Sequence, residues 1–505
     1  MKKLKCALFS MLFFSLILYV KAFGQSGVGS DNILSGLSPQ SVWNNFYEIT
    51  KIPRCSGEEK EIRDWIIETA KNLGLNTVVD EVGNLKIEKS ASPGYESHEG
   101  VVLQAHLDMV CSPKNMEFPL QLKVSDGWLS ATNTTLGADD GIGVAYALAI
   151  LADNSISHPP LEVLFTVEEE TGLLGANNLK EDFITYRKLI NLDSEKEGVI
   201  TIGCAGGGRS TITMPLERDA EIPEMLPMVV SVNGLLGGHS GVDVDSRANP
   251  NKLLAEFLYE ANKIMPELRL ISIKSGEQDN VIPAKSDAWI LIDSDNSGHL
   301  EGLKDRMLKK WSEQYGDIEP NINIDIYEAS MQTPITKELT NNIINMLNEL
   351  PYGVIAWSKE LENTIETSVN ISPVNTYTNS FRMTMMSRSA KLDEREKLRN
   401  QIKEIANKYG AECVNNKGYV PWEPNFDSPL LAFASQVYNN LYETEPEIKV
   451  THGGLETAAI GGIYTGMDMI AIGPTIENAH SPNEKINIKS VENVYSYLLE
   501  LLRAL

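Results

Sequence analysis

Apolar and polar residues follow one another in two different patterns along this chain. Up to about residue 208, amphipathic stretches with a helical period alternate with short runs that are almost wholly apolar. The predicted helices cover residues 40–49, 57–73 and 141–152, and the predicted strands cover residues 100–105, 161–167 and 188–192. Continuous apolar runs of this length are typical of parallel strands that are covered on both faces. The order therefore predicts a βαβ layout around a mostly parallel sheet.

The pattern changes near Arg209 and changes back after Trp422. Between them, strands and helices of ordinary amphipathic character alternate, and a similar order of elements recurs from about residue 368 to 420. The first pass has predicted strands over residues 228–232, 269–275, 288–292 and 321–327 and helices over 250–264 and 300–314, and the second pass has a helix over 393–409. After Trp422, a helix over 430–442, a strand over 469–472 and a helix over 490–502 restore the first pattern.

These patterns predict an α/β domain that is split by an insertion. The α/β domain comprises residues 31–209 and 423–505 and has a mixed, mostly parallel sheet. The inserted domain over residues 210–422 is predicted to be α+β, ferredoxin-like, and present in one or two copies. A chain of 505 residues has room for two or three cores of ordinary size, which excludes a single small binding module.

The composition is globular but strongly acidic, with 44 Lys and Arg against 69 Asp and Glu and a formal net charge of −25. A surface of this charge repels phosphate groups, which argues against nucleic acid and anionic membranes as partners. The acidic residues also supply carboxylates that can bind metal ions.

The first residues differ from the rest of the chain. Three lysines precede an apolar run over residues 7–20, and small residues stand at Ala22 and Gly24. This arrangement predicts a secretory signal peptide over residues 1–24, and hence a secreted or periplasmic protein. An uncleaved membrane anchor is the alternative, although the run is shorter than the ~20 residues that a span needs. No later stretch is long and apolar enough to span, so no membrane span is expected in the mature chain.

The cysteines are sparse. Cys6 falls inside the predicted signal peptide, and Cys55, Cys111, Cys204 and Cys413 are scattered without C-x-x-C spacing. This spacing indicates neither a thiolate zinc site nor a dense disulfide framework. The fold is therefore expected to rest on packing.

Acids and histidines follow the predicted buried strands at the point where each strand ends. They are His106 and Asp108 after the first strand, Glu168, Glu169 and Glu170 after the second, Asp193 after the third, and His480 after the strand over 469–472. Asp139 and Asp140 add two carboxylates where a helix begins, although helix capping is the favoured role for Asp140. Because ligands bind at the carboxyl ends of strands in open α/β sheets, these side chains are expected to meet at one sheet edge.

Imidazole and carboxylate groups without thiolate suit a catalytic zinc ion, or a similar divalent ion, that keeps an open position. Five separate segments offer such a ligand, which is more than one ion usually takes from a protein. A pair of ions about 3.5–4 Å apart that share one carboxylate is the simpler arrangement. A further carboxylate beside the pair could take a proton from water. The residues therefore predict metal-assisted hydrolysis.

Several ordered motifs strengthen this prediction. They are Gln104-Ala-His-Leu-Asp-Met-Val110, Thr135-Leu-Gly-Ala-Asp-Asp-Gly-Ile-Gly143, Glu169-Glu-Thr-Gly172, Asn191-Leu-Asp-Ser-Glu195, Gly234-Leu-Leu-Gly-Gly-His-Ser-Gly241, Asn280-Val-Ile-Pro283, His452-Gly-Gly-Leu-Glu456 and Ala479-His-Ser-Pro-Asn-Glu484. In this order they resemble the motifs of aminoacyl-histidine dipeptidases, which are carnosinase-like members of the co-catalytic dizinc metallopeptidase family. The resemblance covers essentially the whole mature chain and implies a phosphorylase/hydrolase-like catalytic domain with an inserted lid.

The resemblance implies a role for each residue of the cluster. His106 and Asp193 would bind one metal ion, Glu170 and His480 the other, and Asp139 would bridge them. Asp108 would orient the ring of His106, and Glu169 would be the general base that activates the bridging water, giving a metal-bound hydroxide, and later protonates the leaving amine. Members of the family also have a cis peptide after the bridging Asp, which predicts one between Asp139 and Asp140.

The resemblance also implies residues that contact the substrate. His239, in the inserted domain, would polarise the scissile carbonyl after closure of the two domains. Asn280, Arg388 and Gly454 match positions that hold the substrate backbone and its C-terminal carboxylate, and Arg382 is a nearby alternative to Arg388.

The expected protein is thus a metallodipeptidase that cuts short unblocked peptides of the Xaa-His type, such as carnosine. It would use two divalent ions, zinc first, with cobalt or manganese as alternatives, and act as a monomer or homodimer. Two alternatives stay open. The chain could be an aminotripeptidase or an N-acyl amino acid deacylase of the same family, or an inactive peptide-binding protein that keeps the fold.

Overall fold

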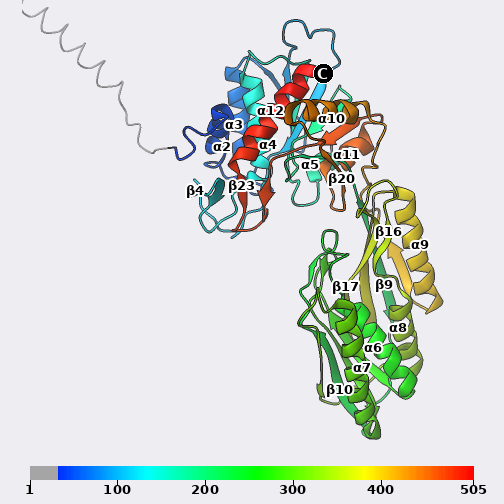
Figure 1. The fold of residues 1–505 in the computed structure, drawn as a ribbon. Helices are drawn as coiled ribbons and strands as arrows, with labels where there is room; N and C mark the ends of the chain where they lie inside the picture. The colour runs from blue at the N-terminus through cyan, green and yellow to red at the C-terminus, as the bar shows by residue number, and fades with distance from the viewer. Residues whose placement is uncertain (1–31) are drawn as a thin grey trace, which may run out of the picture.

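The computed structural model describes residues 32–505, so the predicted signal peptide over residues 1–24 lies outside the described residues. Figure 1 shows two lobes joined at a narrow waist. We call residues 32–205 together with 420–505 the split lobe, and residues 206–419 the inserted lobe. Each lobe is built around its own large sheet. No helix among the described residues is long and apolar enough to cross a membrane.

The sheet of the split lobe has eight strands, and its centre is parallel. In order of pairing they are β1 (Asn76–Val79), β2 (Leu85–Lys89), β6 (Leu161–Thr166), β3 (Val101–His106), β7 (Lys188–Asn191), β21 (Asp468–Ala471), β8 (Val199–Cys204) and β20 (Glu447–Thr451). The strand β21, from the end of the chain, is thus placed between β7 and β8. All residues of β3 and β6 are buried, as their apolar runs predict.

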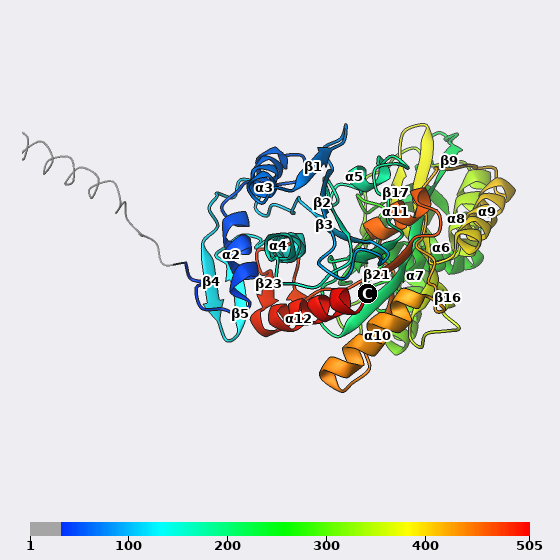
Figure 2. The same cartoon turned by 90° about the horizontal axis from the view of Figure 1, so that it is seen from above.

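Helices cover both faces of this sheet (Figure 2). Alternate residues explain the two layers, because Leu103 packs into the larger core whereas Val102, on the opposite face, packs into a smaller one. The larger core includes α2 (Gln40–Ile49), α3 (Lys60–Asn72), α4 (Ala138–Ala152), α10 (Pro429–Tyr442) and α12 (Ile488–Ala504). The smaller core includes α5 (Leu174–Asn177) and α11 (Glu456–Ile463). A four-stranded side sheet comprises β22 (Ile476–Glu477), β23 (Lys485–Asn487), β5 (Trp128–Ala131) and β4 (Leu122–Ser125).

The sheet of the inserted lobe is antiparallel. Its order is β15 (Asn323–Glu328), β10 (Met225–Asn233), β14 (Ser286–Asp293), β12 (Arg269–Ser275), β17 (Ile365–Thr376), β18 (Ser380–Ser389), β9 (Gly206–Pro215) and β19 (Glu412–Asn415), and β16 (Gly353–Trp357) also pairs with β17. Its core contains residues of α6 (Pro250–Ile264), α7 (Ser297–Tyr315), α8 (Lys337–Glu349) and α9 (Leu392–Lys408). A short ribbon of β11 (Gly238–His239) and β13 (Val281–Ile282) completes the lobe.

The chain crosses between the lobes twice, and the two crossings lie side by side. Cys204 pairs with Trp422, and Gly207 pairs with Tyr419, in antiparallel bridges. Gly206 has no room for a side chain, because a Cβ there would overlap the backbone of the second crossing. Arg395 of α9 donates to the carbonyl oxygens of Gly207 and Tyr419 and so binds both crossings. The domain boundaries predicted at 209/210 and 422/423 stay predictions.

Candidate metal centre

The parallel strands bring the predicted ligands to one edge of the sheet. β3 ends at His106, β6 leads to Glu169 and Glu170, and β7 leads to Asp193, so these residues follow the carboxyl ends of three neighbouring strands. Asp139 comes from the first turn of α4, which lies against β3. His480 comes from the loop between β22 and β23.

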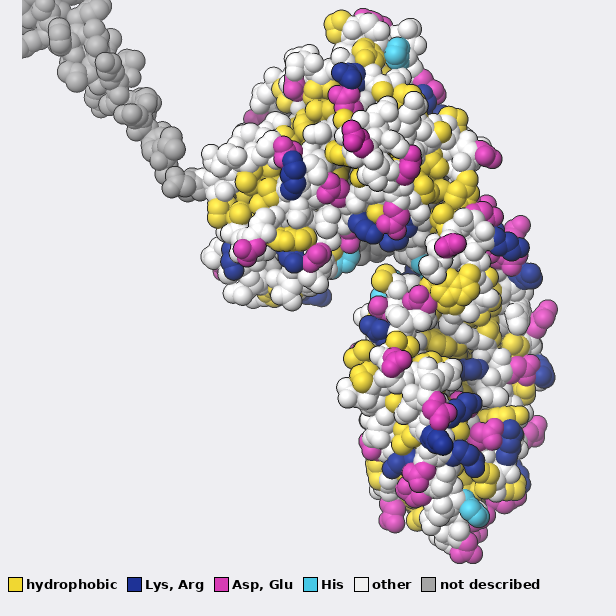
Figure 3. Space-filling view, viewed as in Figure 1, with side chains coloured by type: hydrophobic (Ala, Val, Ile, Leu, Met, Phe, Trp, Pro, Cys, Tyr) yellow, Lys and Arg dark blue, Asp and Glu magenta, His cyan; other side chains and the backbone are white. Residues whose placement is uncertain are grey.

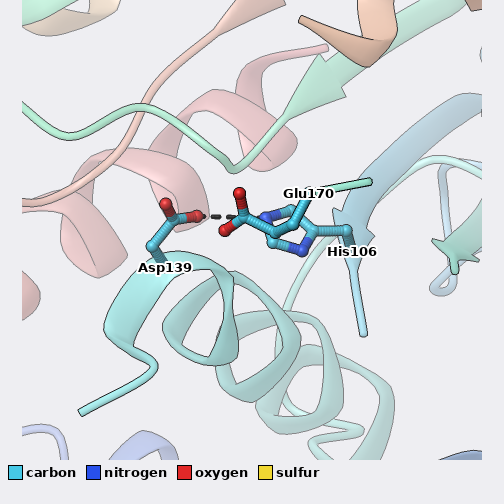
Figure 4. Close-up of side chains that lie close together, drawn as sticks. All are labelled: His106, Asp139 and Glu170. Atoms are coloured by element: carbon cyan, nitrogen blue, oxygen red, sulfur yellow. Dashed lines mark hydrogen bonds and ion pairs between the residues drawn. The ribbon is translucent and has the colours of Figure 1, made fainter. Parts of the chain in front are cut away.

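His106 faces two carboxylates. Its Nε2 atom is 3.0 Å from Oδ1 of Asp139 and 3.5 Å from Oδ1 of Asp193. Candidate ligand atoms of His106, Asp139 and Glu170 all lie within 4.8 Å of one another. Figure 4 shows these three side chains pointing toward a common centre from β3, α4 and the segment after β6. His106 is buried, so its ring cannot turn to solvent.

His480 completes a second, overlapping group. Its Nε2 atom is 2.9 Å from Oδ2 of Asp139 and 2.9 Å from Oε1 of Glu170. The two oxygens of Asp139 therefore face different imidazoles, one on each side. The side chain of His480 is 49% exposed whereas that of Asp139 is 9% exposed, so the cluster opens to solvent on the His480 side.

Asp108 organises the loops around the cluster. Its Oδ1 atom is 3.4 Å from Nδ1 of His106 and accepts a hydrogen bond from the amide of Glu169 at 2.9 Å. Its Oδ2 atom accepts from Ser56 and from the amide of Glu170. Asp108 thus contacts the ring that it is expected to orient and also binds the segment that carries Glu169 and Glu170.

The peptide bond between Asp139 and Asp140 is cis, as the resemblance implies. Asp140 itself accepts from the amide of Gly143 at 3.1 Å and from the amide of His106 at 3.1 Å. Its carboxylate therefore binds one amide in the first turn of α4, as a capping residue would, and one at the end of β3. Asp140 also forms a second group of candidate ligands with His106 and Asp193.

Several carboxyl groups in and beside the cluster lie in surroundings that disfavour their ionisation. Burial raises the pKa of Asp193 well above its ordinary value, and the charge of Asp139 adds to this effect. Burial also raises the pKa of Glu169 well above its ordinary value, with a contribution from Glu170, and burial raises that of Asp140 to about 8. Although burial opposes it, hydrogen bonds from His106 and His480 hold the pKa of Asp139 below its usual range. Added positive charge would relieve this repulsion.

The inserted lobe places a third histidine opposite this edge. His239 lies in β11, and its Nδ1 atom accepts hydrogen bonds from the amides of Gly241 and Val242. Burial lowers the pKa of His239, and the charges of Arg388 and His480 add to the effect. His239 is thus near enough to His480 for their charges to interact. Figure 3 shows histidine side chains on both sides of the notch between the lobes.

The predicted substrate-binding residues lie at different depths. Arg388, in β18, is buried, and it donates to the phenol oxygen of Tyr419 at 2.9 Å and to Ser240 at 3.4 Å. Arg382, the nearby alternative, is exposed, and the choice of Arg388 stays a prediction. Asn280 is exposed, and its carbonyl accepts from the amide of Ser240 at 2.9 Å. A Cβ at Gly454 would lie 3.2 Å from the ring of Tyr419.

Three features of this region were not expected from the sequence. Cys55 and Cys111 form a disulfide, which corrects the expectation that packing alone holds the fold; their separation of 56 residues carries no recognisable spacing signal. Arg54 and Glu484 are buried beside the ligand loops and bind backbone groups there. Glu484 belongs to the motif that contains His480, and that motif is the one signal that could have singled it out.

Comparison with known proteins agrees with this geometry. The sequence profile of Peptidase family M20/M25/M40 matches residues 102–504. The chain belongs to this peptidase family. The cytosol non-specific dipeptidase of Escherichia coli (strain K12) is 35% identical over 478 residues, which are 93% of this chain and 98% of that protein. These findings confirm the resemblance and the expectation of a peptide hydrolase.

Solved structures of peptidases show the same fold. The aminoacylhistidine dipeptidase of Vibrio alginolyticus is 34% identical, covers 94% of this chain and 98% of its own, and superposes with a TM-score of 0.86. Aminopeptidase PepT of Bacillus cereus shares the fold at 16% identity and a TM-score of 0.59, over 93% of this chain and 99% of its own. The predicted fold class of the M20/M25/M40 member is thus confirmed.

The expectation of a secreted or periplasmic protein is wrong. It depended on an apolar run after three lysines, and such a run identifies a hydrophobic segment without fixing its destination. The M20/M25/M40 relative from Escherichia coli, matched over nearly its whole length, is by name an enzyme of the cytosol, which favours the cytosol instead.

Proposed function

We propose that this M20/M25/M40 member hydrolyses dipeptides, including those of the Xaa-His type, at a centre of two divalent ions. The observation that carries the proposal is the position of Asp139, whose two carboxylate oxygens face His106 and His480 at 3.0 and 2.9 Å. His106 and Asp193 would hold one ion, His480 and Glu170 the other, with Asp139 shared between them. The family membership and the two dipeptidase relatives support the same activity.

The donor set fits two divalent ions. It contains imidazole and carboxylate groups without thiolate, and its buried carboxyls have raised pKa values that cations would lower. When bound, such ions supply Lewis acidity, which lowers the pKa of water and polarises a carbonyl group. Zinc is the first candidate on ligand type, and cobalt and manganese remain alternatives.

Glu169 is proposed to move the proton. Its backbone is held by Asp108 and its carboxyl group is partly buried beside the cluster. Burial gives this carboxyl a raised pKa, so it binds a proton more readily than an exposed glutamate does. It can take a proton from the attacking water and return it to the amine that leaves.

His239 is proposed to stabilise the oxyanion. Because its Nδ1 atom accepts from two amides, the ring proton of the neutral form resides on Nε2, which is then a donor. The lowered pKa keeps the ring neutral, so no charge must be buried with it. A donor supplied from the inserted lobe would complete the site only when the lobes hold the substrate between them.

Arg388, Asn280 and Gly454 are proposed to bind the substrate. The guanidinium of Arg388 suits a C-terminal carboxylate, because its planar fork can make two parallel hydrogen bonds. A buried cation at this position favours short peptides, whose free carboxylate can reach it. The preference for His at the second position is carried by the relative from Vibrio alginolyticus alone, whose name specifies it.

The test combines metal analysis with a substrate panel. Purified protein should contain about two divalent ions per chain, lose activity after chelation, and regain it with zinc, cobalt or manganese. Carnosine and other dipeptides should be cleaved faster than Leu-Gly-Gly and acetyl-Met. Faster cleavage of Leu-Gly-Gly would identify an aminotripeptidase, and faster cleavage of acetyl-Met a deacylase. A protein that binds peptides without cleaving any of them would overturn the proposal. Light scattering of the same sample would distinguish a monomer from a homodimer.

A further inference from the structure

Two buried charged residues that the proposed chemistry does not use lie directly behind the ligand loops. Arg54 is 2% exposed and Glu484 is 1% exposed. Neither faces the centre where the candidate ligands converge, because both bind backbone groups instead. Burying a charge is costly unless it is compensated, so such a pair needs a specific reason.

Arg54 connects two ligand loops. Its Nη1 atom donates to the carbonyl oxygens of Leu107 at 2.9 Å and Asp108 at 2.7 Å, and its Nη2 atom donates to the carbonyl oxygen of Gly137. The first two carbonyls directly follow His106, and the third lies two residues before Asp139. One rigid, planar group therefore spans the loop of His106 and the turn of Asp139.

Arg54 also explains two glycines of the Gly137-Ala-Asp-Asp-Gly141 motif. A Cβ at Gly137 would lie 2.5 Å from Nη2 of Arg54, and a Cβ at Gly141 would lie 2.6 Å from the same atom. Gly137 in addition has a φ of 66°, which favours glycine. The turn is thus shaped to receive the guanidinium.

Glu484 binds the same turn from the amide side. Its carboxylate accepts hydrogen bonds from the amides of Leu136 at 2.8 Å, Gly137 at 2.9 Å and Ala138 at 2.7 Å. Glu484 lies four residues after His480, in the same loop. It therefore connects the loop of His480 to the turn of Asp139, as Arg54 connects the loop of His106 to it.

We propose that Arg54 and Glu484 are positioning residues that set the separation of the two metal sites, by fixing the turn of Asp139 relative to the loops of His106 and His480. The inference rests on the proposed dinuclear site. The two residues carry opposite charges on either side of one turn, so each offsets part of the cost of burying the other. Both residues are buried and bind backbone groups of the ligand loops, so both would act through the metal ligands.

The test uses the Arg54→Lys and Glu484→Gln variants of the full chain. Lysine keeps the positive charge but cannot span three carbonyls, and glutamine keeps the shape of the side chain but removes its charge. Zinc affinity is measured by competition with a chromophoric chelator, alongside kcat, KM and the melting temperature. Residues that orient metal ligands typically contribute ~10–100-fold in metal affinity or activity. We expect losses of this size in zinc affinity and in kcat, with KM unchanged.

Two control variants match the chemistry away from the metal-ligand cluster. Arg218, in the inserted lobe, also donates to several backbone carbonyls, those of Ile271 in β12 and of Thr333 and Thr378. Glu162, in β6, is a buried carboxylate that accepts from the amides of Thr185 and Tyr186. Arg218→Lys and Glu162→Gln should lower the melting temperature, as the loss of a structural contact does. Their zinc affinity and kcat should stay at the wild-type values.

The outcomes separate this inference from the proposed function. Wild-type protein that binds no divalent ion overturns both. Wild-type protein that binds two ions, with Arg54→Lys and Glu484→Gln variants of equal zinc affinity and kcat, overturns the positioning role alone, even if the variants melt earlier. If Arg54→Lys does not fold, the isosteric Glu484→Gln variant decides, because it changes one charge and little of the packing.

Discussion

Both lobes bury charged side chains, but they differ in what those charges face. In the inserted lobe, Glu319 accepts from the amides of Leu236 and Ala248, and Lys252 donates to carbonyl oxygens at the end of α8. Each charge there is compensated by backbone dipoles of its own surroundings. In the split lobe, carboxylates and imidazoles face one another at the sheet edge, and several carboxyls have raised pKa values. A buried charge alone therefore does not mark a site, whereas buried charges that oppose one another do.

The largest expected effect is that of Glu169→Gln in the split lobe. Removing a general base typically lowers turnover by about 10²–10⁴-fold. We expect kcat for a dipeptide to fall by this factor while the metal content, measured by elemental analysis, stays at the wild-type value. The buried Glu319 of the inserted lobe binds two loop amides and lies outside the cluster, so Glu319→Gln should lower the melting temperature more than the activity. Full activity in Glu169→Gln would show that another group carries the proton.

The next largest effect is expected from the disulfide. It closes a loop of 56 residues next to Arg54 and Asp108, and a crosslink of this kind contributes about 2–4 kcal/mol to the free energy of unfolding. The double variant Cys55→Ser with Cys111→Ser should lose stability of this order in denaturant titrations. Cys413, a free buried cysteine of the inserted lobe, is the matched control, and Cys413→Ser should cost less. Equal losses of unfolding free energy in the double variant and in Cys413→Ser would show that the disulfide gives the split lobe no additional stability.

A smaller effect is expected at Arg388, where the inserted lobe contributes to the substrate site. A hydrogen bond to a charged group contributes about 1.5–3 kcal/mol. Arg388→Lys should therefore raise KM for dipeptides by about 10–100-fold and leave zinc affinity unchanged. Dipeptide amides, which lack the C-terminal carboxylate, provide the control, because their KM should change little. An equal change for both substrate types would place the carboxylate elsewhere.

The smallest effect concerns pH and has opposite signs in the two lobes. Burial raises the pKa of Glu456, in the split lobe, to about 7, and it lowers that of Lys252, in the inserted lobe, to about 8. The folded state thus binds more protons than the unfolded state between the unfolded pKa of Glu456 and pH 7, and stability falls with rising pH there. For Lys252 the folded state binds fewer protons above pH 8, and stability rises toward pH 10.5.

Substituting Glu456 or Lys252 should change the slope of the unfolding free energy against pH in metal-free protein. Glu456→Gln should reduce the fall below pH 7, to which the other carboxyls with raised pKa values also contribute, and Lys252→Met should reduce the rise above pH 8, each with a change of about 1–3 kcal/mol. Denaturant titrations at several pH values measure both slopes. Unchanged slopes in the two variants would mean that neither residue determines the pH dependence of its lobe.

The sequence predicts some strands of the split lobe and misses others, such as β8, which is buried throughout. The strand expected over 161–167 is β6 (Leu161–Thr166), because a buried parallel strand requires a continuous apolar run. β20 (Glu447–Thr451), at the edge, alternates exposed and partly buried residues and carries no such signal. The predicted second pass corresponds to β17, β18, α9 and β19. Its strands do not form a separate sheet but join those of the first pass in one continuous sheet. α8 was not predicted.

The candidate ligands could be named from motifs, whereas the contacts that Arg54 and Glu484 make behind them could not. The role of Arg54 depends on carbonyl groups 53, 54 and 83 residues away, and backbone groups leave no trace in sequence. Glu484 binds amides 346 to 348 residues away. Such contacts exist only once the sheet has brought the loops together, so they follow from the fold and not from any local pattern.

The place of β21 between β7 and β8 has a consequence for how the molecule is made. Residues 206–419 are continuous in the chain and can fold as soon as they leave the ribosome, whereas the central sheet of the split lobe lacks an inner strand until Asp468–Ala471 has been synthesised. The inserted lobe can thus complete its fold before β20 and β21 of the split lobe have been synthesised. His106 and Asp193 are made before the inserted lobe, yet the cluster that they form with Asp139 and His480 can assemble only after the loop of His480 has been synthesised.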